Sequence, residues 1–450
     1  MKTFAKGIHP TYQKEGTAGS QIVAAAVPQR VVIALHQNLG ASCEPLVKVG
    51  DLVVEGQKIG ETSKFISAAV HSSISGKVTK IEKLPHPCGV NVLSIIIEGQ
   101  EVLSPKSGVD TGHRTSDLGQ RTLDNVAPDE IRSAVKEAGI VGLGGAAFPT
   151  HVKLTPPAGK NIDTILINGC ECEPYITADH RVMLEKAREV VLGSKLVAKA
   201  CGANRVIFGV ESNKKDAIKV LRDEIRRNPE DGLYDGIEVI ELETKYPQGG
   251  EKVLIKATLD REVPSGGLPL DVGVVVANVG TCVAISEAVF IGQPLIKRVV
   301  TVTGSGIKEP KNLLVRIGTS FKDIIDQCGG LTADAYQVIM GGPMMGVAQA
   351  SLDVPIVKAT SCILVLNKKE VSQEKIYPCI KCGNCIDNCP MNLVPTKLAA
   401  YAEYDKYSEF EEWGGQDCME CGSCVYVCPA KIPIVQWIKL AKLKLRQMKE

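Results

Sequence analysis

Eight cysteines near the C-terminal end of the chain form two runs with the same spacing. Each run follows C-x2-C-x2-C-x3-C and is followed by a proline. The runs consist of Cys379, Cys382, Cys385 and Cys389, then Cys418, Cys421, Cys424 and Cys428. This pattern is typical of proteins that bind two [4Fe–4S] clusters, which transfer single electrons. Structural zinc is the alternative, but zinc sites use C-x2-C pairs rather than four-cysteine runs.

In a two-cluster arrangement the fourth cysteine of each run ligates the other cluster. The sequence therefore predicts one cluster on Cys379, Cys382, Cys385 and Cys428. The second cluster is expected on Cys418, Cys421, Cys424 and Cys389. The other eight cysteines are scattered between Cys43 and Cys362, and in a reducing compartment we expect no disulfide framework.

A second candidate site begins at a glycine-rich loop that contains Gly142, Gly144, Gly145 and Phe148 and ends at Thr150. Glycines let a backbone pass close to a flat ring or a phosphate. The loop has neither a Rossmann nor a Walker fingerprint. Taken alone, it fits a structural turn equally well.

Polar residues elsewhere could complete this site. Lys153 follows the loop and could meet a phosphate. Asn168 and Glu171 follow one expected strand, and Asn278 and Thr281 follow another. Ligands of α/β sheets bind at the carboxyl ends of strands, so we expect these side chains to converge.

The elements that position these residues fall into several parts. The expected class is multidomain α/β and α+β. An N-terminal extension (1–30) precedes a β barrel-sandwich domain (31–104) and a polar linker (105–127). An α/β domain (128–296), a compact α+β unit (297–365) and a helical ferredoxin-like domain (366–450) follow.

The α/β domain shows alternating strand and helix patterns, which indicate a mostly parallel sheet with flanking helices. Strands are expected at 163–167, 205–210, 237–240 and 272–276, and helices at 129–138, 181–200 and 217–226. Between the two cysteine runs, residues 394–412 are predicted to be helical.

Length, charge and hydropathy exclude several classes of protein. The chain has 450 residues, about three domains. Its 52 basic and 51 acidic residues give a net charge of +1, so nucleic acid is not expected as a partner. No window is apolar enough for a transmembrane helix. Residues 1–7 lack a signal-peptide core, so we expect a cytoplasmic protein.

The glycine-rich loop and its companions resemble the NADH-binding flavoprotein subunit of respiratory complex I. The resemblance implies that the α/β domain binds FMN non-covalently and NAD(H) as substrate. The implied FMN residues are Gly142, Gly144, Gly145, Lys153, Asn168, Glu171, Asn278 and Thr281. Residues 246–251 resemble that family's Tyr-x-x-Gly-Glu-Glu, so Glu251 and Phe148 would meet NADH.

This chain departs from the complex I pattern at three positions. Gly250 replaces the first glutamate of the pair, which bears on the nicotinamide pocket. Cys170 and Cys172 stand where that family has other residues. They are either a redox pair near the flavin or ordinary buried thiols.

The domain order as a whole resembles the RnfC family of the Rnf complexes, beginning with Phe4-x-x-Gly7-Ile8-His9-Pro10. The resemblance implies that the α+β unit is an SLBB-like β-grasp domain. It also implies the NADH-facing subunit of a membrane-bound ferredoxin:NAD+ oxidoreductase that drives sodium or proton transport. Other membrane and iron–sulfur subunits would bring electrons from ferredoxin and hold the chain peripherally at the cytoplasmic face of the membrane. Hydride transfer needs no general acid or base, so no catalytic side chain is assigned.

Two other functions remain open at this stage. A soluble flavin/iron–sulfur reductase could feed a proline reductase or cobalamin, although cobalamin reductases of this type resemble a rearranged chain without an N-terminal barrel. Alternatively, the chain could be an electron wire and docking subunit that binds no nucleotide, and Gly250 keeps that alternative open.

Two surface features also have two interpretations each. Residues 47–59 resemble a lipoyl or biotinyl carrier, which would modify Lys64, but the tip lacks the Asp-Lys signature and a plain docking barrel is favoured. The C-terminal segment has an apolar stripe beside basic residues. It could lie on a membrane or pack on the ferredoxin-like domain. The stripe contains Ile434, Trp437, Ile438, Ala441, Leu445 and Met448, and the basic residues are Lys439, Lys442, Arg446 and Lys449.

Overall fold

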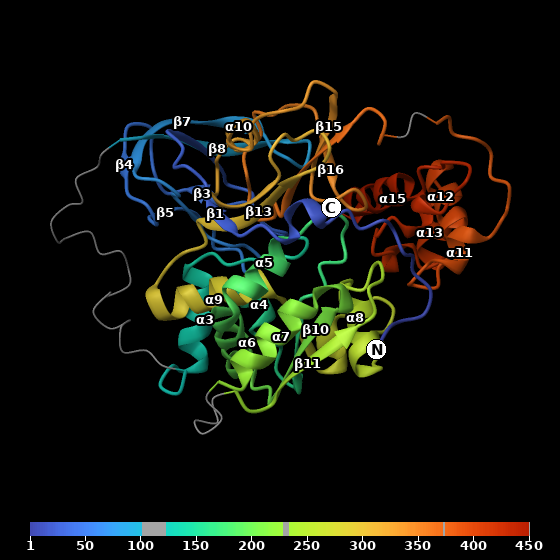
Figure 1. The fold of residues 1–450 in the computed structure, drawn as a ribbon, viewed down its shortest axis with the longest axis horizontal. Coiled ribbons are helices and arrows are strands. Elements are labelled where there is room, and N and C mark those ends of the chain that lie inside the picture. Colours follow the sequence, from blue (N-terminus) through green and yellow to red (C-terminus); the bar gives the residue numbers. More distant parts are fainter. Residues whose placement is uncertain (101–122, 228–233, 372–373, 450) are drawn as a thin grey trace.

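The computed structural model describes residues 1–100, 123–227, 234–371 and 374–449. Figure 1 shows the barrel and the six-stranded sheet above the α/β domain, with the cysteine-bearing helices at one end. The predicted linker 105–127 lies mostly outside the described residues. No helix within the described part of the chain is both long and apolar enough to cross a membrane.

The barrel-sandwich consists of two small antiparallel sheets. The first has the order β2-β8-β7-β4, with bounds Arg30–Ala34, Asn91–Gly99, Gly76–Pro85 and Leu52–Val53. The second has the order β3-β5-β6, with bounds Glu44–Pro45, Lys58–Glu61 and Val70–His71. Lys64 and Phe65 are exposed just beyond β5.

The α/β domain contains a four-stranded parallel sheet in the order β11-β10-β9-β12. The bounds are β9 Thr164–Asn168, β10 Arg205–Glu211, β11 Ile237–Leu242 and β12 Val274–Asn278. The chain proceeds outward from β9 to β11 and then returns to place β12 on the other side of β9. The reversal point between β9 and β12 is where such sheets bind ligands.

Helices cover this sheet as the alternating pattern predicts. They are α3 Pro128–Glu137, α4 Thr150–Lys153, α5 Ala178–Glu185, α6 Ala187–Cys201, α7 Lys215–Ile225, α8 Glu251–Leu259 and α9 Val279–Ile291, with short turns η1 Ser212–Lys214 and η3 Pro269–Val272. The prediction of a single helix over 181–200 is wrong, because this segment belongs to two helices, α5 and α6. The chain leaves helical geometry at Lys186 (φ −129°, ψ 34°), which separates α5 from α6.

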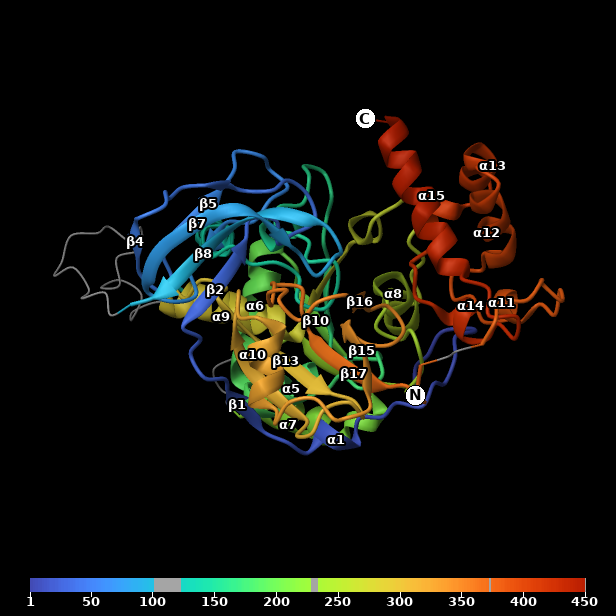
Figure 2. The ribbon, with the colours of Figure 1, turned by 90° about the horizontal axis from the view of Figure 1, so that it is seen from above.

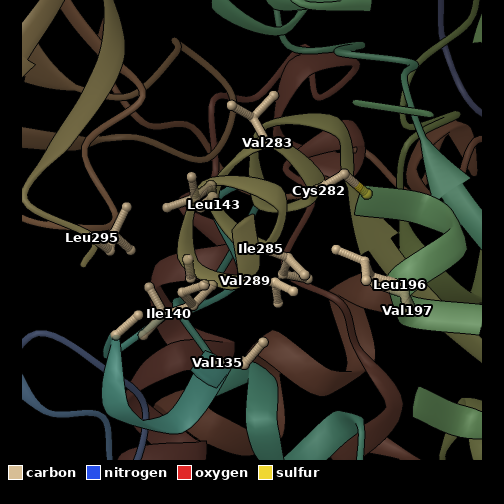
Figure 3. Packing of buried hydrophobic residues seen from close by; sticks show 14 of the residues in the cluster. Val135, Ile140, Leu143, Leu196, Val197, Cys282, Val283, Ile285, Val289 and Leu295 are labelled. Atoms are coloured by element: carbon tan, nitrogen blue, oxygen red, sulfur yellow. The ribbon is translucent and has the colours of Figure 1, made fainter. Parts of the chain in front are cut away.

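The largest buried cluster lies where α3, α6 and α9 meet (Figure 3). Val135 of α3, Leu196 and Val197 of α6 and Ile285 and Val289 of α9 are all fully buried there. The same cluster continues into the barrel. The barrel and the α/β domain therefore share a core, and the glycine-rich loop is held between them.

The α+β unit forms a six-stranded sheet in the order β1-β14-β13-β17-β15-β16. The bounds are β13 Lys297–Thr303, β14 Lys311–Arg316, β15 Ala335–Met340, β16 Val347–Gln349 and β17 Cys362–Asn367, with helix α10 Phe321–Gln327. Its edge strand β1, Ile22–Ala24, comes from the N-terminal segment and pairs parallel to β14. That segment also carries α1, Glu15–Ala18. No local pattern in the sequence indicates this pairing.

The ferredoxin-like domain is helical. Its elements are α11 Asn384–Asp387, α12 Pro395–Glu403, α13 Tyr407–Glu412, η4 Gly415–Asp417, α14 Ser423–Tyr426 and α15 Ile434–Lys449. The helix predicted for 394–412 is interrupted at Asp405, whose φ of +55° ends α12 before α13 begins.

The apolar stripe of α15 packs against the rest of this domain. Ile434, Ile438, Ala441 and Leu445 are buried with Leu398 and Phe410. Trp437 packs at the edge of the same cluster, whereas Met448 is exposed. Of the two interpretations of the C-terminal segment, this burial agrees with packing on the ferredoxin-like domain.

Candidate functional site

The two cysteine runs surround two separate cavities. Cys379, Cys382, Cys385 and Cys428 line one of them, which has a volume of about 180 Å³. Cys389, Cys418, Cys421 and Cys424 line the other. In both cases the fourth cysteine of one run lines the cavity of the other run, as in the crossed ligand sets. We call 379–385 the outer loop and 418–424 the inner loop.

The type and number of donor atoms around each cavity match what a [4Fe–4S] cluster needs. Each set offers four thiols, and apolar residues such as Ile432 or Leu398 complete the lining. Across the described residues, no three His, Cys, Asp or Glu side chains converge closely enough to hold a single metal ion. The outer cavity has room for more than one ion, whereas the inner cavity measures about 20 Å³, and cluster ligation at both stays a prediction.

Burial distinguishes the two loops. Cys379 and Cys382 of the outer loop are exposed, whereas Cys421 and Cys424 of the inner loop are buried. Burial raises the pKa of the Cys418 thiol to about 11. Lys442 of α15 donates from Nζ to the Cys418 carbonyl at 2.5 Å and pairs with Glu420 at 2.9 Å.

The predicted flavin residues lie around the carboxyl edge of the parallel sheet. Asn168 and Asn278 are register partners at the ends of β9 and β12. Asn168 donates from Nδ2 to the Gly249 carbonyl at 2.8 Å. Asn278 caps α9, since its side-chain oxygen accepts from the backbone N–H of Gly280 and Thr281.

The glycine-rich loop lies over the start of α9. The Gly142 N–H donates to the Phe148 carbonyl at 2.9 Å, which closes the loop. The Leu143 N–H donates to the Thr281 hydroxyl oxygen at 2.9 Å. A Cβ at Gly144 would lie 2.7 Å from the Asn278 amide nitrogen, so a larger residue there would displace the Asn278 side chain. Gly145 faces open space, which leaves its backbone accessible to a ligand.

Lys153 and Glu251 meet at this edge although 98 residues separate them. Lys153 Nζ lies 3.0 Å from a Glu251 carboxylate oxygen and donates to the Val276 carbonyl at 3.2 Å. Their side chains are 31% and 41% exposed. The pair therefore presents both signs of charge at a partly open sheet edge, which suits a phosphate or a nucleotide ribose.

Glu171 has a structural role that the sequence did not reveal. Its carboxylate accepts the backbone N–H groups of Asp179 at 2.6 Å and His180 at 3.1 Å and so caps α5. The Asp179 carboxylate in turn accepts from Asn278 Nδ2 at 2.6 Å. Burial and the nearby Glu171 raise the pKa of Asp179 to about 7. Acidic residues are common in the first turn of a helix. The sequence therefore did not single out Asp179 as a partner of Asn278.

Two buried lysines donate hydrogen bonds to backbone carbonyls of the loop after β9. Lys14, from the N-terminal segment, donates to the carbonyls of Glu171, Glu173 and Ile176 at 2.6–3.0 Å. Lys214 donates to the Cys170 carbonyl at 2.5 Å. Sequence reasoning missed both, because a lone lysine far away in sequence carries no local pattern.

Cys170 and Cys172 have different surroundings. Cys170 is fully buried, and its thiol lies 3.5 Å from the Gly209 carbonyl. Cys172 accepts a hydrogen bond from the Gly249 N–H at 3.3 Å and packs in a cluster with Cys421 and Tyr246. Burial raises the pKa of both thiols, which keeps them protonated at neutral pH and favours ordinary packed thiols.

The inner loop docks directly beside this sheet edge, next to α8 (Figure 2). Asp417, just before the loop, accepts the Gly266 N–H at 3.0 Å and pairs with Lys252 of α8 at 3.5 Å. Met419 lies against Gly250: a Cβ at Gly250 would lie only 2.2 Å from the Met419 methyl carbon. The position where the complex I pattern has glutamate therefore receives a side chain from the inner loop.

Four family models match this chain. They are the RnfC barrel sandwich hybrid domain over residues 2–101, the Nuo51 FMN-binding domain over 135–287, the SLBB domain over 299–348 and the 4Fe-4S dicluster domain over 378–432. The predicted fold class is confirmed, and so are the predicted cofactor classes, FMN and 4Fe-4S clusters.

Similar proteins match over nearly the full length. The C-subunit of a proton-translocating ferredoxin:NAD(+) oxidoreductase complex from Clostridium ljungdahlii is 47% identical, covering 98% of this chain and 94% of the relative. The C-subunit of a Na(+)-translocating complex from Acetobacterium woodii is also 47% identical, over 98% and 96%. The C-subunit of an ion-translocating oxidoreductase complex from Rhodobacter capsulatus is 41% identical, over 98% and 83%.

Among solved structures, an NAD+-reducing [NiFe]-hydrogenase in the H2-reduced state aligns with a TM-score of 0.53 at 17% identity. The alignment covers 76% of this chain and 66% of that one, so it supports the fold alone. From the full-length relatives and the RnfC model, we conclude that this chain belongs to the RnfC family, the C-subunits of the ion-translocating ferredoxin:NAD(+) oxidoreductase complexes.

Proposed function

We propose that this chain is the NAD(H)-reacting subunit of a membrane-bound ferredoxin:NAD+ oxidoreductase that translocates ions. It passes electrons between NAD(H), FMN and two [4Fe–4S] clusters. The observation that carries the proposal is the docking of the inner loop on the sheet edge where the flavin residues converge. FMN, when bound, exchanges two electrons with NAD(H) and single electrons with the clusters.

The burial of the two cavities supports an order for this transfer. The inner loop faces the flavin edge, whereas the outer loop presents two exposed cysteines. Ile376 and Tyr377, just before the outer loop, are 64% and 58% exposed, and Ile380 within it is 69% exposed. We infer that the outer cluster exchanges electrons with a partner subunit and the inner cluster with the flavin.

The side chains at the sheet edge have separate proposed roles. The backbone of Gly144 and Gly145 and the Lys153 ammonium would bind the flavin phosphate or ring. Asn168, Asn278 and Thr281 hold the loops that form this surface, and Glu171 caps α5 beside it. Phe148 and Glu251 would orient the nicotinamide.

The proposed partners and location rest on family membership. We propose that other membrane and iron–sulfur subunits hold this chain peripherally at the cytoplasmic face of the cell membrane and supply electrons that originate from ferredoxin. The two relatives with 47% identity name different ions, protons and Na+. The proposal therefore includes ion translocation but assigns no ion.

The test uses the anaerobically purified full chain with reconstituted clusters and added FMN. NADH should bleach the flavin absorbance, and EPR signals of reduced clusters should follow. Variants Gly144→Val and Lys153→Met should weaken FMN binding, measured by flavin fluorescence. If both variants bound FMN as tightly as the wild type, the result would contradict the proposed flavin site.

One observation favours a second function, an electron wire that binds no nucleotide. Met419 fills the space beside Gly250, where the complex I pattern has a glutamate. If this is the function, FMN will stay oxidised in NADH while dithionite still reduces the clusters. Flavin bleaching by NADH would instead exclude it.

A further inference from the structure

Tyr246 connects the flavin edge to the inner loop through a buried hydrogen bond. Its hydroxyl donates to the Cys421 carbonyl at 2.6 Å and also lies against the Glu173 carboxylate, and the residue is 1% exposed. Its backbone pairs with Ile8 of the N-terminal segment through two hydrogen bonds of 2.8 and 2.9 Å. Tyr246 is thus fixed at its backbone, and its hydroxyl reaches into another domain.

The residues that follow Tyr246 lead straight to the proposed nicotinamide site. Gly249 binds the end of β9 and the loop that follows it, because its carbonyl accepts from Asn168 and its N–H donates to the Cys172 thiol. Gly250 seats Met419 of the inner loop, and Glu251 begins α8. One short segment, 246–251, therefore contacts the flavin edge and the inner loop at the same time.

We propose that Tyr246 is a positioning residue that fixes the inner cluster against the flavin edge and tunes its potential. The inference rests on the proposed function, since it takes Cys421 as a cluster ligand. The positive end of the Tyr246 O–H dipole points at the carbonyl of that ligand. Such a dipole stabilises the extra negative charge of a reduced cluster, so it raises the potential.

The experiment compares Tyr246→Phe with the wild-type full chain after anaerobic cluster reconstitution. Tyr12→Phe is the matched control, because the Tyr12 hydroxyl is also buried but has no hydrogen-bond partner among the described residues. Iron content and redox titrations followed by EPR are measured. Cys382→Ser, which lacks an outer-loop thiol, assigns the two EPR signals.

We expect Tyr246→Phe to keep the full iron content and to shift the inner-cluster potential to a more negative value. The outer-cluster potential and the Tyr12→Phe protein should match the wild type. Unchanged potentials, or equal shifts of both clusters, would overturn the inference while leaving the proposed function intact. Wild-type chain with one cluster or none would instead refute the cluster assignment itself.

A second pair of variants decides the case in which Tyr246→Phe loses the inner cluster. In Gly250→Ala the new Cβ pushes on Met419, which should disturb the inner-cluster signal. Met419→Ala removes the obstructing side chain, so Gly250→Ala/Met419→Ala should match Met419→Ala alone. Recovery in the double variant supports positioning by segment 246–251, and failure to recover overturns it.

Discussion

The outer and inner loops have one sequence pattern and one backbone but different surroundings. Lys381 and Glu420 occupy matching positions with φ of 56° and 59°. Each donates its N–H to the first cysteine sulfur of its loop at 3.4 Å. These local features are what a C-x2-C-x2-C run needs to wrap a cluster.

The surroundings supply what the pattern does not contain. Tyr246 and Lys442 donate to carbonyls of the inner loop, and Ser265 and Lys252 hold the adjacent Asp417. The outer loop instead faces solvent at Cys379 and Cys382. Spacing therefore predicts where clusters bind, and tertiary contacts place the inner loop, rather than the outer loop, beside the proposed flavin site.

The largest expected effect comes from removing one ligand in each loop. Cys421→Ser and Cys382→Ser should each lose about half of the bound iron, since each loop serves one of two clusters. With NADH, Cys382→Ser should still give an EPR signal from the inner cluster. Cys421→Ser should give no NADH-reduced cluster signal, because the proposed order places the inner cluster between the flavin and the outer cluster. Reduction of the outer cluster by NADH in Cys421→Ser would contradict the proposed order.

The next effect tests the positive charge beside the inner loop. Lys442→Met removes an ammonium that lies 2.5 Å from the Cys418 carbonyl and leaves Glu420 without its partner. The reduced cluster loses a favourable interaction of about 1.7 kcal/mol, the value expected for unit charges about 10 Å apart at an effective dielectric constant of about 20. The inner-cluster potential should therefore become more negative in an EPR-monitored titration.

Lys439→Met is the control for that measurement. Lys439 is an exposed residue of the same helix, α15. Its variant should leave both potentials unchanged. An equal shift in the two variants would indicate a general effect of net charge rather than the contact with Cys418.

Much of the fold and of the candidate site could be predicted from the sequence. The parallel sheet follows from alternating apolar strands and amphipathic helices, and Asn168 and Asn278 meet because both end neighbouring parallel strands. Contacts between distant segments could not be predicted. Lys14 beneath the loop after β9, β1 on the six-stranded sheet and Tyr246 on Cys421 depend on how the parts pack together, and no local periodicity records that.

A third effect concerns pH at the sheet edge beside the inner loop. Burial and Glu171 raise the pKa of Asp179 to about 7, whereas an unfolded aspartate titrates near about 3.9. Between these values the native state binds more protons than the unfolded state, so stability falls as pH rises through this window. Asp179→Asn removes this effect and keeps an oxygen that can accept from Asn278.

The expected result is a flatter dependence of Tm on pH for Asp179→Asn between about pH 5 and pH 8. As the pH rises over that range, the free energy of unfolding of Asp179→Asn should increase relative to wild type by more than about 1 kcal/mol. The reason is that a difference of one bound proton changes the free energy of unfolding by about 1.4 kcal/mol per pH unit. Asp129→Asn, at a solvent-exposed carboxylate of α3, should follow the wild-type curve. Parallel curves for all three proteins would contradict the raised pKa.

The smallest effect contrasts two ion pairs, one beside each loop. Lys252 pairs with Asp417 beside the inner loop, at 26% and 15% exposure. Lys431 pairs with Glu374 near the outer loop, at 41% and 61% exposure. Exposed ion pairs contribute about 0–1 kcal/mol to stability. Lys431→Met should therefore leave the hydrogen-exchange rates of all backbone N–H groups unchanged. Lys252→Met should speed exchange of the Gly266 N–H, which donates to Asp417, because the carboxylate is then held by fewer groups. Equal exchange at Gly266 in both variants would show that the inner loop docks without this pair and that Tyr246 and Met419 hold it in place.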